Sequence, residues 1–286
     1  MSFRGDSIFF PLKILTSGYD AINFIERTGA KIYMASAIIV AAGKGMRMQD
    51  PVRKQYLRLG GRPIVSHTLM AVDGCDLIRS IILVIPPEDE DFCRQKIVSP
   101  LNLHKQIQLV AGGAQRQDSV FNGLSAINDK ESPVAIHDGV RPFVTAEQIS
   151  QCIQTAKETG ACIMGIPVLD TVKRADGQQR VAETLDRSAL WLSQTPQVFD
   201  FHIIHRAHII ARQEAYQGSD DSLLVERLGY KVKIIPGTQS NIKITTPEDL
   251  LIGEAILQPG GVPGRQIPAE RGQAEPRHYC IELLVV

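Results

Sequence analysis

The first third of the sequence contains a glycine-bearing loop with four nearby cations. Residues 41–56 read A-A-G-K-G-M-R-M-Q-D-P-V-R-K-Q-Y, and the cations are Lys44, Arg47, Arg53 and Lys54. Small residues let backbone N–H groups approach an anion closely, and the cations supply compensating charge. A tight structural turn would also explain the glycines, but such a turn has no need of clustered cations. We therefore predict that this loop binds a polyphosphate.

The loop matches neither of two common phosphate-binding patterns. A Walker A loop requires Gly-Lys followed by Ser or Thr, whereas Gly45 is followed by Met46 and Arg47. The dinucleotide fingerprint requires a third glycine at the position of Met48. The loop is therefore assigned to neither class.

A second glycine motif, G-G-A-Q-R-Q-D-S-V at residues 112–120, follows a predicted strand and opens a predicted helix. Asp118 or Ser119 could cap that helix, or Ser119 could hydrogen-bond a base or sugar, and local sequence leaves both open. Arg116 is expected to hold the loop by pairing with an acid.

A third motif, H-D-G-V-R-P-F at residues 137–143, ends another predicted strand. Asp138 and Arg141 suit a site where Mg²⁺-bound phosphates meet a second substrate, and a structural ion pair between them is the alternative. His137 is expected to be a hydrogen-bonded structural residue, because no Ser-His-Asp set or metal-ligand cluster accompanies it.

Four further polar clusters could not be linked to these motifs by spacing. Two of them contain single cations, Arg187 and Lys243, for which a solvated surface position is the default. The clusters are residues 185–187, 193–197, 219–221 and 241–245.

Composition indicates one large globular domain, with or without appendages. The chain has 286 residues, of which 44% are hydrophobic and 22% charged, and its formal net charge is zero. The zero net charge argues against a nucleic-acid binder, which needs a basic face. Five scattered cysteines without a C-x-x-C pair fit reduced thiols in a cytoplasmic protein. The apolar stretch at residues 8–15 is too short to span a membrane.

Apolar runs alternate with segments of helical spacing, which predicts an α/β fold around a mostly parallel twisted sheet. Ligands bind at the carboxyl ends of the strands in such sheets, and the three motifs above each follow a strand. The predicted strands are residues 36–40, 80–85, 107–110, 133–136, 161–168, 231–235 and 242–244. The predicted helices cover residues 64–72, 120–127, 149–156, 201–210 and 222–228, with a final helix from Pro247 capped by Thr246.

Residues 170–191 interrupt this alternation with a run of alternating charges around Asp176-Gly177. The pattern predicts a projecting β-hairpin, and because an isolated hairpin is marginally stable, we expect it to pack on a second subunit. The resulting domain prediction is an N-terminal extension over residues 1–34, expected to be non-essential. A domain then covers residues 35–258, with the hairpin arm at about 169–192, and a flexible tail covers 259–286.

Six motifs in order resemble the 2-C-methyl-D-erythritol 4-phosphate cytidylyltransferase family of the non-mevalonate isoprenoid pathway. They are A-A-G-x-G-x-R-M…K-Q-Y, G-G-x-x-R-x-x-S-V, H-D-x-x-R-P, D-T-V-K-R, D-R-x-x-L-W…T-P-Q and N-I-K-I-T, between about Ser36 and Leu257. The resemblance implies a Rossmann-like nucleotidyltransferase fold that transfers CMP from CTP to methylerythritol phosphate and releases diphosphate. It also implies Mg²⁺ or another divalent cation, held mainly by the CTP phosphates, with Asp138 as a candidate ligand.

The resemblance also implies roles for individual residues. The catalytic cations would be Arg47, Lys54, Arg187 and Lys243. The nucleotide would be bound by Ala41, Ala42, Gly43, Gly45, Gly113, Ser119 and Asp138. The acceptor would be bound by Asp138, Arg141, Thr171, Arg187, Thr195, Ser219 and Lys243. In this family the hairpin arm joins a homodimer, so Thr171, Arg187 and Thr195 would serve the partner's site. The chain departs from the family pattern at Arg53, where proline is usual, at Ala114, where an acid can occur, and at Ser219, where threonine is common.

Three alternatives stay open at the level of sequence. A related cytidylyltransferase could use a pentitol phosphate such as ribitol 5-phosphate, and a nucleotidyltransferase could use another base. The chain could also be a non-catalytic nucleotide-binding protein.

Overall fold

A computed structural model describes residues 33–43 and 52–258. The chain divides into two units, Met1–Tyr33 and Met34–Val286, and only the second is described below. Gly45 and Arg47, the predicted N-terminal extension and the predicted C-terminal tail all lie outside the described residues, apart from the last residues of the extension.

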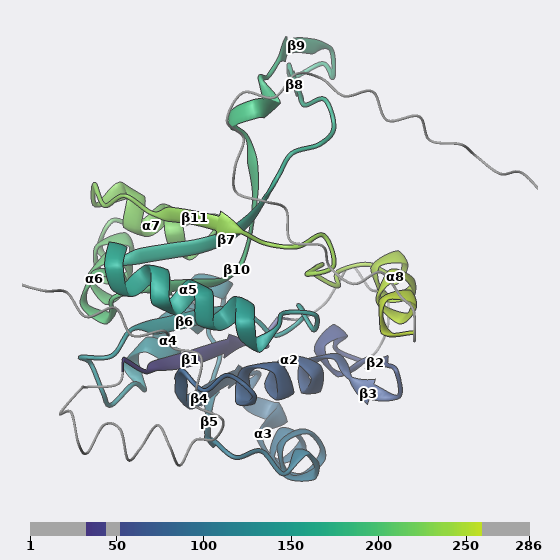
Figure 1. The fold of residues 1–286 in the computed structure, drawn as a ribbon, viewed down its shortest axis with the longest axis vertical. Helices are drawn as coiled ribbons and strands as arrows, with labels where there is room; N and C mark the ends of the chain where they lie inside the picture. Colours follow the sequence, from purple (N-terminus) through teal and green to yellow (C-terminus); the bar gives the residue numbers. More distant parts are fainter. Residues whose placement is uncertain (1–32, 44–51, 259–286) are drawn as a thin grey trace, which may run out of the picture. The chain divides into compact units, whose positions relative to one another are not determined.

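A seven-stranded sheet in the order β11-β7-β10-β6-β1-β4-β5 forms the centre of this unit (Figure 1). All neighbouring strands are parallel except β10, which runs antiparallel to both β6 and β7. The predicted α/β fold with a mostly parallel sheet is therefore confirmed. The strands are β1 (Ala35–Val40), β4 (Ile78–Ile85), β5 (Gln106–Ala111), β6 (Val134–Asp138), β7 (Ala161–Pro167), β10 (Trp191–Phe199) and β11 (Lys233–Pro236).

Helices cover both faces of the sheet, as continuous apolar strands require. On one face α4 (Arg116–Ser125), α6 (Phe201–Gln213) and α7 (Asp221–Arg227) share a hydrophobic core with the sheet. On the other, α2 (Ile64–Asp73) and α5 (Ala146–Thr159) contact each other, and Figure 1 shows both in front of the strands. The last helix, α8 (Pro247–Leu257), begins as predicted, because the Thr246 side chain accepts a hydrogen bond from the backbone N of Asp249.

Short elements complete the described part of the chain. A 3₁₀ helix, η2 (Lys54–Tyr56), precedes a small two-stranded hairpin, β2 (Arg58–Leu59) and β3 (Arg62–Pro63). The β4–β5 connection contains η3 (Pro87–Asp89), α3 (Glu90–Phe92), η4 (Cys93–Val98) and η5 (Ser99–Leu101). None of the described helices is long and apolar enough to cross a membrane.

A hairpin arm projects from the sheet between β7 and β10 (Figure 1). It contains β8 (Lys173–Ala175), β9 (Val181–Thr184) and the 3₁₀ turn η6 (Arg187–Ala189). The β7–β10 pairing continues into its stem, where the backbone N of Val168 donates to the carbonyl of Leu190 at 3.0 Å. The projecting hairpin predicted from the charge pattern is thus present.

The late segments differ from the sequence prediction in two places. Residues 242–244 were expected to form a strand but lie in a loop, because Ile244 is buried in a small separate cluster with Leu59, Ile64 and Val140. Strand β10 was not expected, since Pro196 and polar residues interrupt its apolar pattern. The pairing of β10 with β7 shifts register at this point, between Gln194 and Gln197, which accommodates the proline.

Candidate active site

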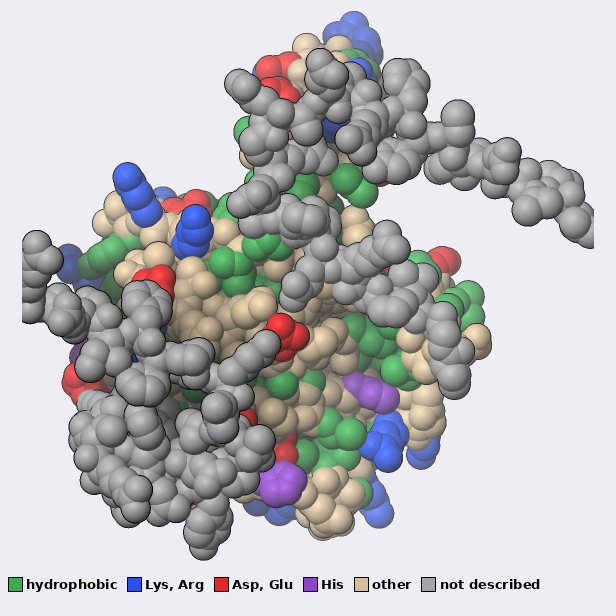
Figure 2. Space-filling model, in the orientation of Figure 1, with side chains coloured by type: hydrophobic (Ala, Val, Ile, Leu, Met, Phe, Trp, Pro, Cys, Tyr) green, Lys and Arg blue, Asp and Glu red, His purple; other side chains and the backbone are tan. Residues whose placement is uncertain are grey.

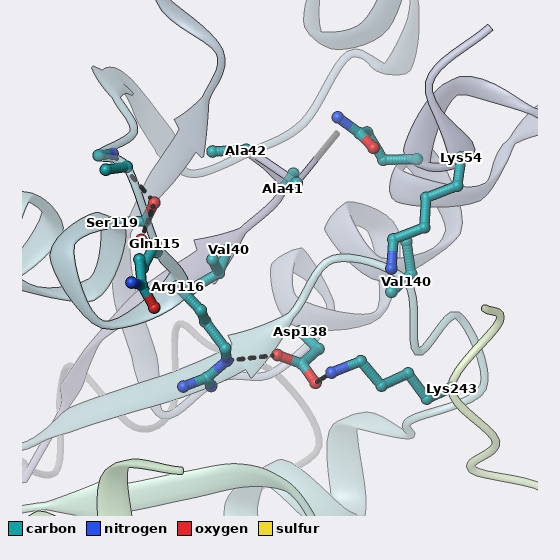
Figure 3. Close-up of a pocket in the computed structure, with 14 residues that line it drawn as sticks. Val40, Ala41, Ala42, Lys54, Gln115, Arg116, Ser119, Asp138, Val140 and Lys243 are labelled. Carbon is teal, nitrogen blue, oxygen red and sulfur yellow. Dashed lines mark hydrogen bonds and ion pairs between the residues drawn. The ribbon is translucent and has the colours of Figure 1, made fainter. Parts of the chain in front are cut away.

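A cleft of about 450 Å³ lies where β1, β5 and β6 end (Figure 3). Parallel strands place their carboxyl ends at one edge, so the loops that follow them meet there. All of the predicted nucleotide-binding residues that the structure describes line this cleft, together with two of the predicted catalytic cations. The lining residues include Ala41, Ala42, Gly43, Lys54, Gly113, Ser119, Asp138 and Lys243.

Close backbone packing explains the glycines of the β5–α4 loop. A Cβ on Gly112 would lie 2.3 Å from the Cβ of Ala42, and one on Gly113 would lie 2.3 Å from the Cβ of Asp118. The Ser119 hydroxyl holds the loop by accepting from the backbone N of Gly113 at 3.1 Å and donating to the carbonyl of Gln115 at 3.0 Å. The loop therefore presents its backbone to the cleft.

The start of α4 decides the capping question that the sequence left open. Gln115 is the N-cap residue of α4, and Asp118 is the third residue of the helix. The Asp118 carboxylate accepts a hydrogen bond from the backbone N of Gln115 at 3.2 Å. Ser119 is not the cap. Its hydroxyl lines the cleft while it ties the loop to the helix.

Three cations surround the Asp138 carboxylate at the base of the cleft. Arg116 Nε lies 3.0 Å from Oδ1, Lys243 Nζ lies 2.7 Å from Oδ2, and Arg141 Nε lies 3.8 Å from Oδ2. Burial alone would raise the pKa of Asp138, but the charges of Arg116, Lys243 and Arg141 outweigh burial and hold the pKa well below its usual range. Asp138 is thus an ionised carboxylate that positions three cations. The alternative of an isolated ion pair between Asp138 and Arg141 is therefore wrong.

Arg116 connects the cleft to a second buried acid. Its Nη1 lies 2.7 Å from Oδ2 of Asp221, whose Oδ1 lies 3.2 Å from Nε2 of the buried His208. Burial would lower the pKa of Arg116, and Asp221 and Asp138 raise it above its usual value instead. The expected pairing of Arg116 with an acid is confirmed. The sequence did not indicate that Asp221 takes part, because the two residues are 105 positions apart.

His137 is a satisfied structural residue, as expected. Its Nε2 lies 3.2 Å from the carbonyl of Arg141, and its Nδ1 lies 2.9 Å from Oγ1 of Thr195. Because a carbonyl only accepts, Nε2 carries the proton and the Thr195 hydroxyl donates to Nδ1. Burial lowers the pKa of His137 to about 4, so the ring is neutral at neutral pH. Both ring nitrogens are engaged, and His137 has none to offer a substrate.

A second cavity of about 230 Å³ adjoins the first and shares Arg116, Asp138 and Lys243 with it. The other residues lining it all come from the predicted acceptor residues and polar clusters, and they include Arg141, Ser193, Thr195 and Ser219. Two cavities therefore lie on either side of one wall of cations and carboxylate.

The position of Thr195 differs from the one expected from the sequence. It was expected to serve the partner's site, but it belongs to the part of β10 inside the sheet and lines the cavity of its own chain. Its hydroxyl accepts from the backbone N of Asp138 at 3.1 Å. The antiparallel strand that the sequence did not reveal is what places it beside β6.

Lys54 lines the cleft from η2, and residues on either side of it in sequence tie this segment to Asp89 in η3. The Tyr56 hydroxyl donates to Asp89 at 3.0 Å, and Arg53 Nε lies 3.1 Å from the same carboxylate. Burial raises the pKa of Tyr56, so its hydroxyl stays protonated. Arg53 also pairs with Glu88. These contacts anchor the segment that carries Lys54.

Two predicted acceptor residues, Thr171 and Arg187, lie in the arm and line neither of these cavities. Both are exposed, and Arg187 donates to the carbonyl of Leu169 within the arm. Their assignment to an acceptor site stays a prediction.

The amino-acid sequence is similar to those of known cytidylyltransferases. A family model described as 2-C-methyl-D-erythritol 4-phosphate cytidylyltransferase matches residues 35–259. A protein of that description from Syntrophus aciditrophicus is 47% identical over 222 residues, which cover 78% of this chain and 95% of the relative. Another from Bacillus velezensis is 47% identical over 223 residues, covering 77% and 94%.

Solved structures agree with the sequence matches. The 4-diphosphocytidyl-2C-methyl-D-erythritol synthase of Anaerococcus prevotii superposes with a TM-score of 0.71 at 37% identity, covering 79% of this chain and 96% of the other. The Thermus thermophilus 2-C-methyl-D-erythritol 4-phosphate cytidylyltransferase gives a TM-score of 0.64 at 32% identity, covering 78% and 98%. By sequence and by fold, the chain belongs to the 2-C-methyl-D-erythritol 4-phosphate cytidylyltransferase family.

Proposed function

We propose that this chain transfers CMP from CTP to the phosphate of 2-C-methyl-D-erythritol 4-phosphate. The reaction releases diphosphate and forms 4-diphosphocytidyl-2-C-methyl-D-erythritol. The observation that carries the proposal is the pair of adjacent cavities that share Arg116, Asp138 and Lys243, with Lys54 in the first and Arg141 in the second. An anionic nucleotide and an anionic acceptor in these cavities would meet at the shared wall.

The chemistry needs cations and positioning rather than a general base. The attacking group is a phosphate monoester whose second pKa is about 6, so it is largely ionised at neutral pH. Its oxygen attacks the α-phosphorus of CTP, and the bond from that phosphorus to the β-phosphate oxygen breaks. Lys54 would offset charge on the departing diphosphate, and Lys243 would hold the acceptor phosphate in line. Arg47 is proposed to act beside Lys54.

The residues of the cleft fit a divalent cation that is held mainly by substrate. Mg²⁺ in nucleotide sites is bound by one or two carboxylates together with phosphate oxygens. The ionised carboxylate in this cleft is Asp138, which we propose as the protein ligand. When bound, the cation would neutralise charge on the triphosphate.

A diphosphate-release assay tests the proposed function directly. With CTP and methylerythritol phosphate, the protein is expected to release diphosphate, whereas ATP, GTP or UTP in place of CTP should support little release. A higher kcat/KM with ribitol 5-phosphate would reassign the acceptor. Absence of release with every combination would reject an enzymatic role.

We propose that the arm joins a homodimer and completes the partner's acceptor site. Figure 2 shows hydrophobic side chains along the stem of the arm below a charged tip. Leu169 and Leu192 are 57% and 55% exposed, and Trp191 is 40% exposed. Exposed apolar side chains of this size are typical of a surface that another chain covers. Arg187, which lines neither cavity of its own chain, would then reach the partner's second cavity.

Mixing two inactive variants tests this arrangement. Arg187→Ala and Lys54→Ala homodimers are each expected to have low activity. If Arg187 acts on the partner, each mixed dimer contains one site with both wild-type residues, so random exchange should restore about a quarter of wild-type activity. An exchanged mixture that stays inactive would show that Arg187 acts within its own chain.

The domain boundaries stay a prediction. We propose that residues 35–258 suffice for activity, and the diphosphate-release assay on a protein truncated to this range tests it. We also propose a cytoplasmic location, which suits four described cysteines that are all buried and free.

A further inference from the structure

Gln55 is a buried amide that has no hydrogen-bond partner among the described residues. The residue is 1% exposed, and neither Nε2 nor Oε1 of its side chain bonds to another group in the described part of the protein. Burying an unpaired amide destabilises a folded protein, because its hydrogen bonds to water are lost and not replaced. An apolar side chain of the same length would occupy this position at lower cost.

Other buried glutamines show what a structural amide looks like in this chain. Gln148 donates from Nε2 to Oγ1 of Thr238 at 3.2 Å, and its Oε1 accepts from the backbone N of Thr145 at 3.0 Å. Its two ends are both occupied, as is usual for buried amides. Gln55 lacks both contacts, so a structural role does not explain it.

Gln55 lies at the end of the cleft where Lys54 is proposed to bind the polyphosphate. It lines the 450 Å³ cleft together with Gly43 and Lys54, the residue before it in η2. The contacts of Tyr56 with Asp89 and with Cys93 Sγ, at 3.0 and 3.1 Å, hold η2 from the opposite side. Gln55 is therefore a fixed group on a cleft wall.

The opposite wall carries the groups proposed to hold cytidine. Figure 3 shows Ser119 and Gln115 across the cleft from Lys54, with Ala41 and Ala42 between them. Gln55 follows Lys54 directly in η2 and both line the cleft, so a ligand group beside Gln55 lies at the Lys54 side of the cleft. The group that Lys54 attracts is an anion, and phosphate oxygens only accept hydrogen bonds.

We propose that Gln55 binds the polyphosphate of the nucleotide, with Nε2 donating to a non-bridging oxygen of the β- or γ-phosphate. Its Oε1 accepts from a hydroxyl or a metal-bound water that enters with the nucleotide. The inference rests on the proposed function, since it requires a nucleoside triphosphate in the cleft. It adds a neutral donor beside Lys54 that acts on the departing diphosphate.

Gln55→Met tests the inference with opposite effects on stability and binding. Methionine has a similar length and no amide, so the melting temperature of the substrate-free protein should rise by about 2–4 °C. The KM for CTP should rise, and calorimetric affinity for diphosphate should fall, each by at least about tenfold. Affinity for CMP, which lacks the β- and γ-phosphates, should stay unchanged. Gln55→Glu, which loses the donor and adds negative charge, should weaken diphosphate binding further.

Gln148→Met is the matched control. It removes an amide whose bonds are satisfied and which lies in neither cavity, so it should lower the melting temperature and leave the KM for CTP unchanged. A lower melting temperature for Gln55→Met with wild-type diphosphate affinity would overturn the inference. Equal losses of CMP and CTP affinity would overturn it as well. If the wild-type protein itself binds neither CTP nor diphosphate, the proposed function fails, which distinguishes the two failures.

Discussion

Lys54→Ala is expected to lower kcat by about 10²–10³-fold while the protein stays folded. Charge accumulates on the departing diphosphate as the bond to the α-phosphorus breaks, and a fixed ammonium in the cleft stabilises that charge more in the transition state than in the ground state. Lys54 is half-buried in η2, where Arg53 and Tyr56 are both tied to Asp89. Losing its charge leaves that anchoring intact.

Steady-state diphosphate release at saturating CTP measures the effect, and circular dichroism checks the fold. Lys231→Ala, at an exposed lysine before β11, is the control and should leave kcat unchanged. A kcat for Lys54→Ala close to wild type would remove Lys54 from the catalytic groups. The resemblance predicts a similar loss for Arg47→Ala, a position outside the described residues.

Asp138→Asn is expected to lower the free energy of unfolding by about 3–5 kcal/mol at pH 7. The substitution keeps the shape of the side chain and removes the negative charge that faces Arg116, Arg141 and Lys243. The three cations would then lie close together without this carboxylate between them. Asp221 would remain as the acid bonded to Arg116. Activity should fall too, because Lys243 and Arg141 lose the group that positions them at the shared wall.

The pH dependence gives this prediction a second measurement. The folded-state pKa of Asp138 lies below its unfolded value of about 3.9, so its stabilisation is complete above that pH. The stabilisation is lost as the pH falls from about 4 toward the folded-state pKa. The difference in unfolding free energy between wild type and Asp138→Asn should therefore shrink below about pH 4.

Urea unfolding at pH 7 and at several pH values below 4 measures both effects. Glu90→Gln, which removes an exposed carboxylate from the Glu90–Arg94 pair, is the control and should change stability little. Equal stability of Asp138→Asn and wild type at pH 7 would mean that the three cations do not depend on this carboxylate.

Much of the fold was predictable because the information is local. The apolar runs of β1 and β4 are buried on both faces, and such strands are nearly continuous in hydrophobic residues. The cap of α8 was recognisable because Thr246 and Asp249 interact within one helical turn. The sequence also predicted that Lys54 and the acid at the end of β6 belong to one site, and both line the same cleft.

The rest depended on contacts between distant parts of the chain. Arg116 meets Asp221 only because the sheet order brings α4 next to α7, and no spacing rule predicts a partner 105 residues away. Thr195 reaches Asp138 because β10 inserts antiparallel between β6 and β7, where the apolar pattern is broken by Pro196. Gln55 has both ends of its amide buried without a partner among the described residues, and this too is a property of the packed protein.

The sequence alone thus determined the family, the fold class and the residue types of the cleft, because motifs and local periodicity carry this information. The tertiary structure decided how that chemistry is divided between two cavities and which groups form the wall between them. The physical reason is that hydrogen bonds and ion pairs form only between atoms a few ångströms apart. Distances of that size between Arg116, Asp138 and Lys243 exist only once the strand order is set.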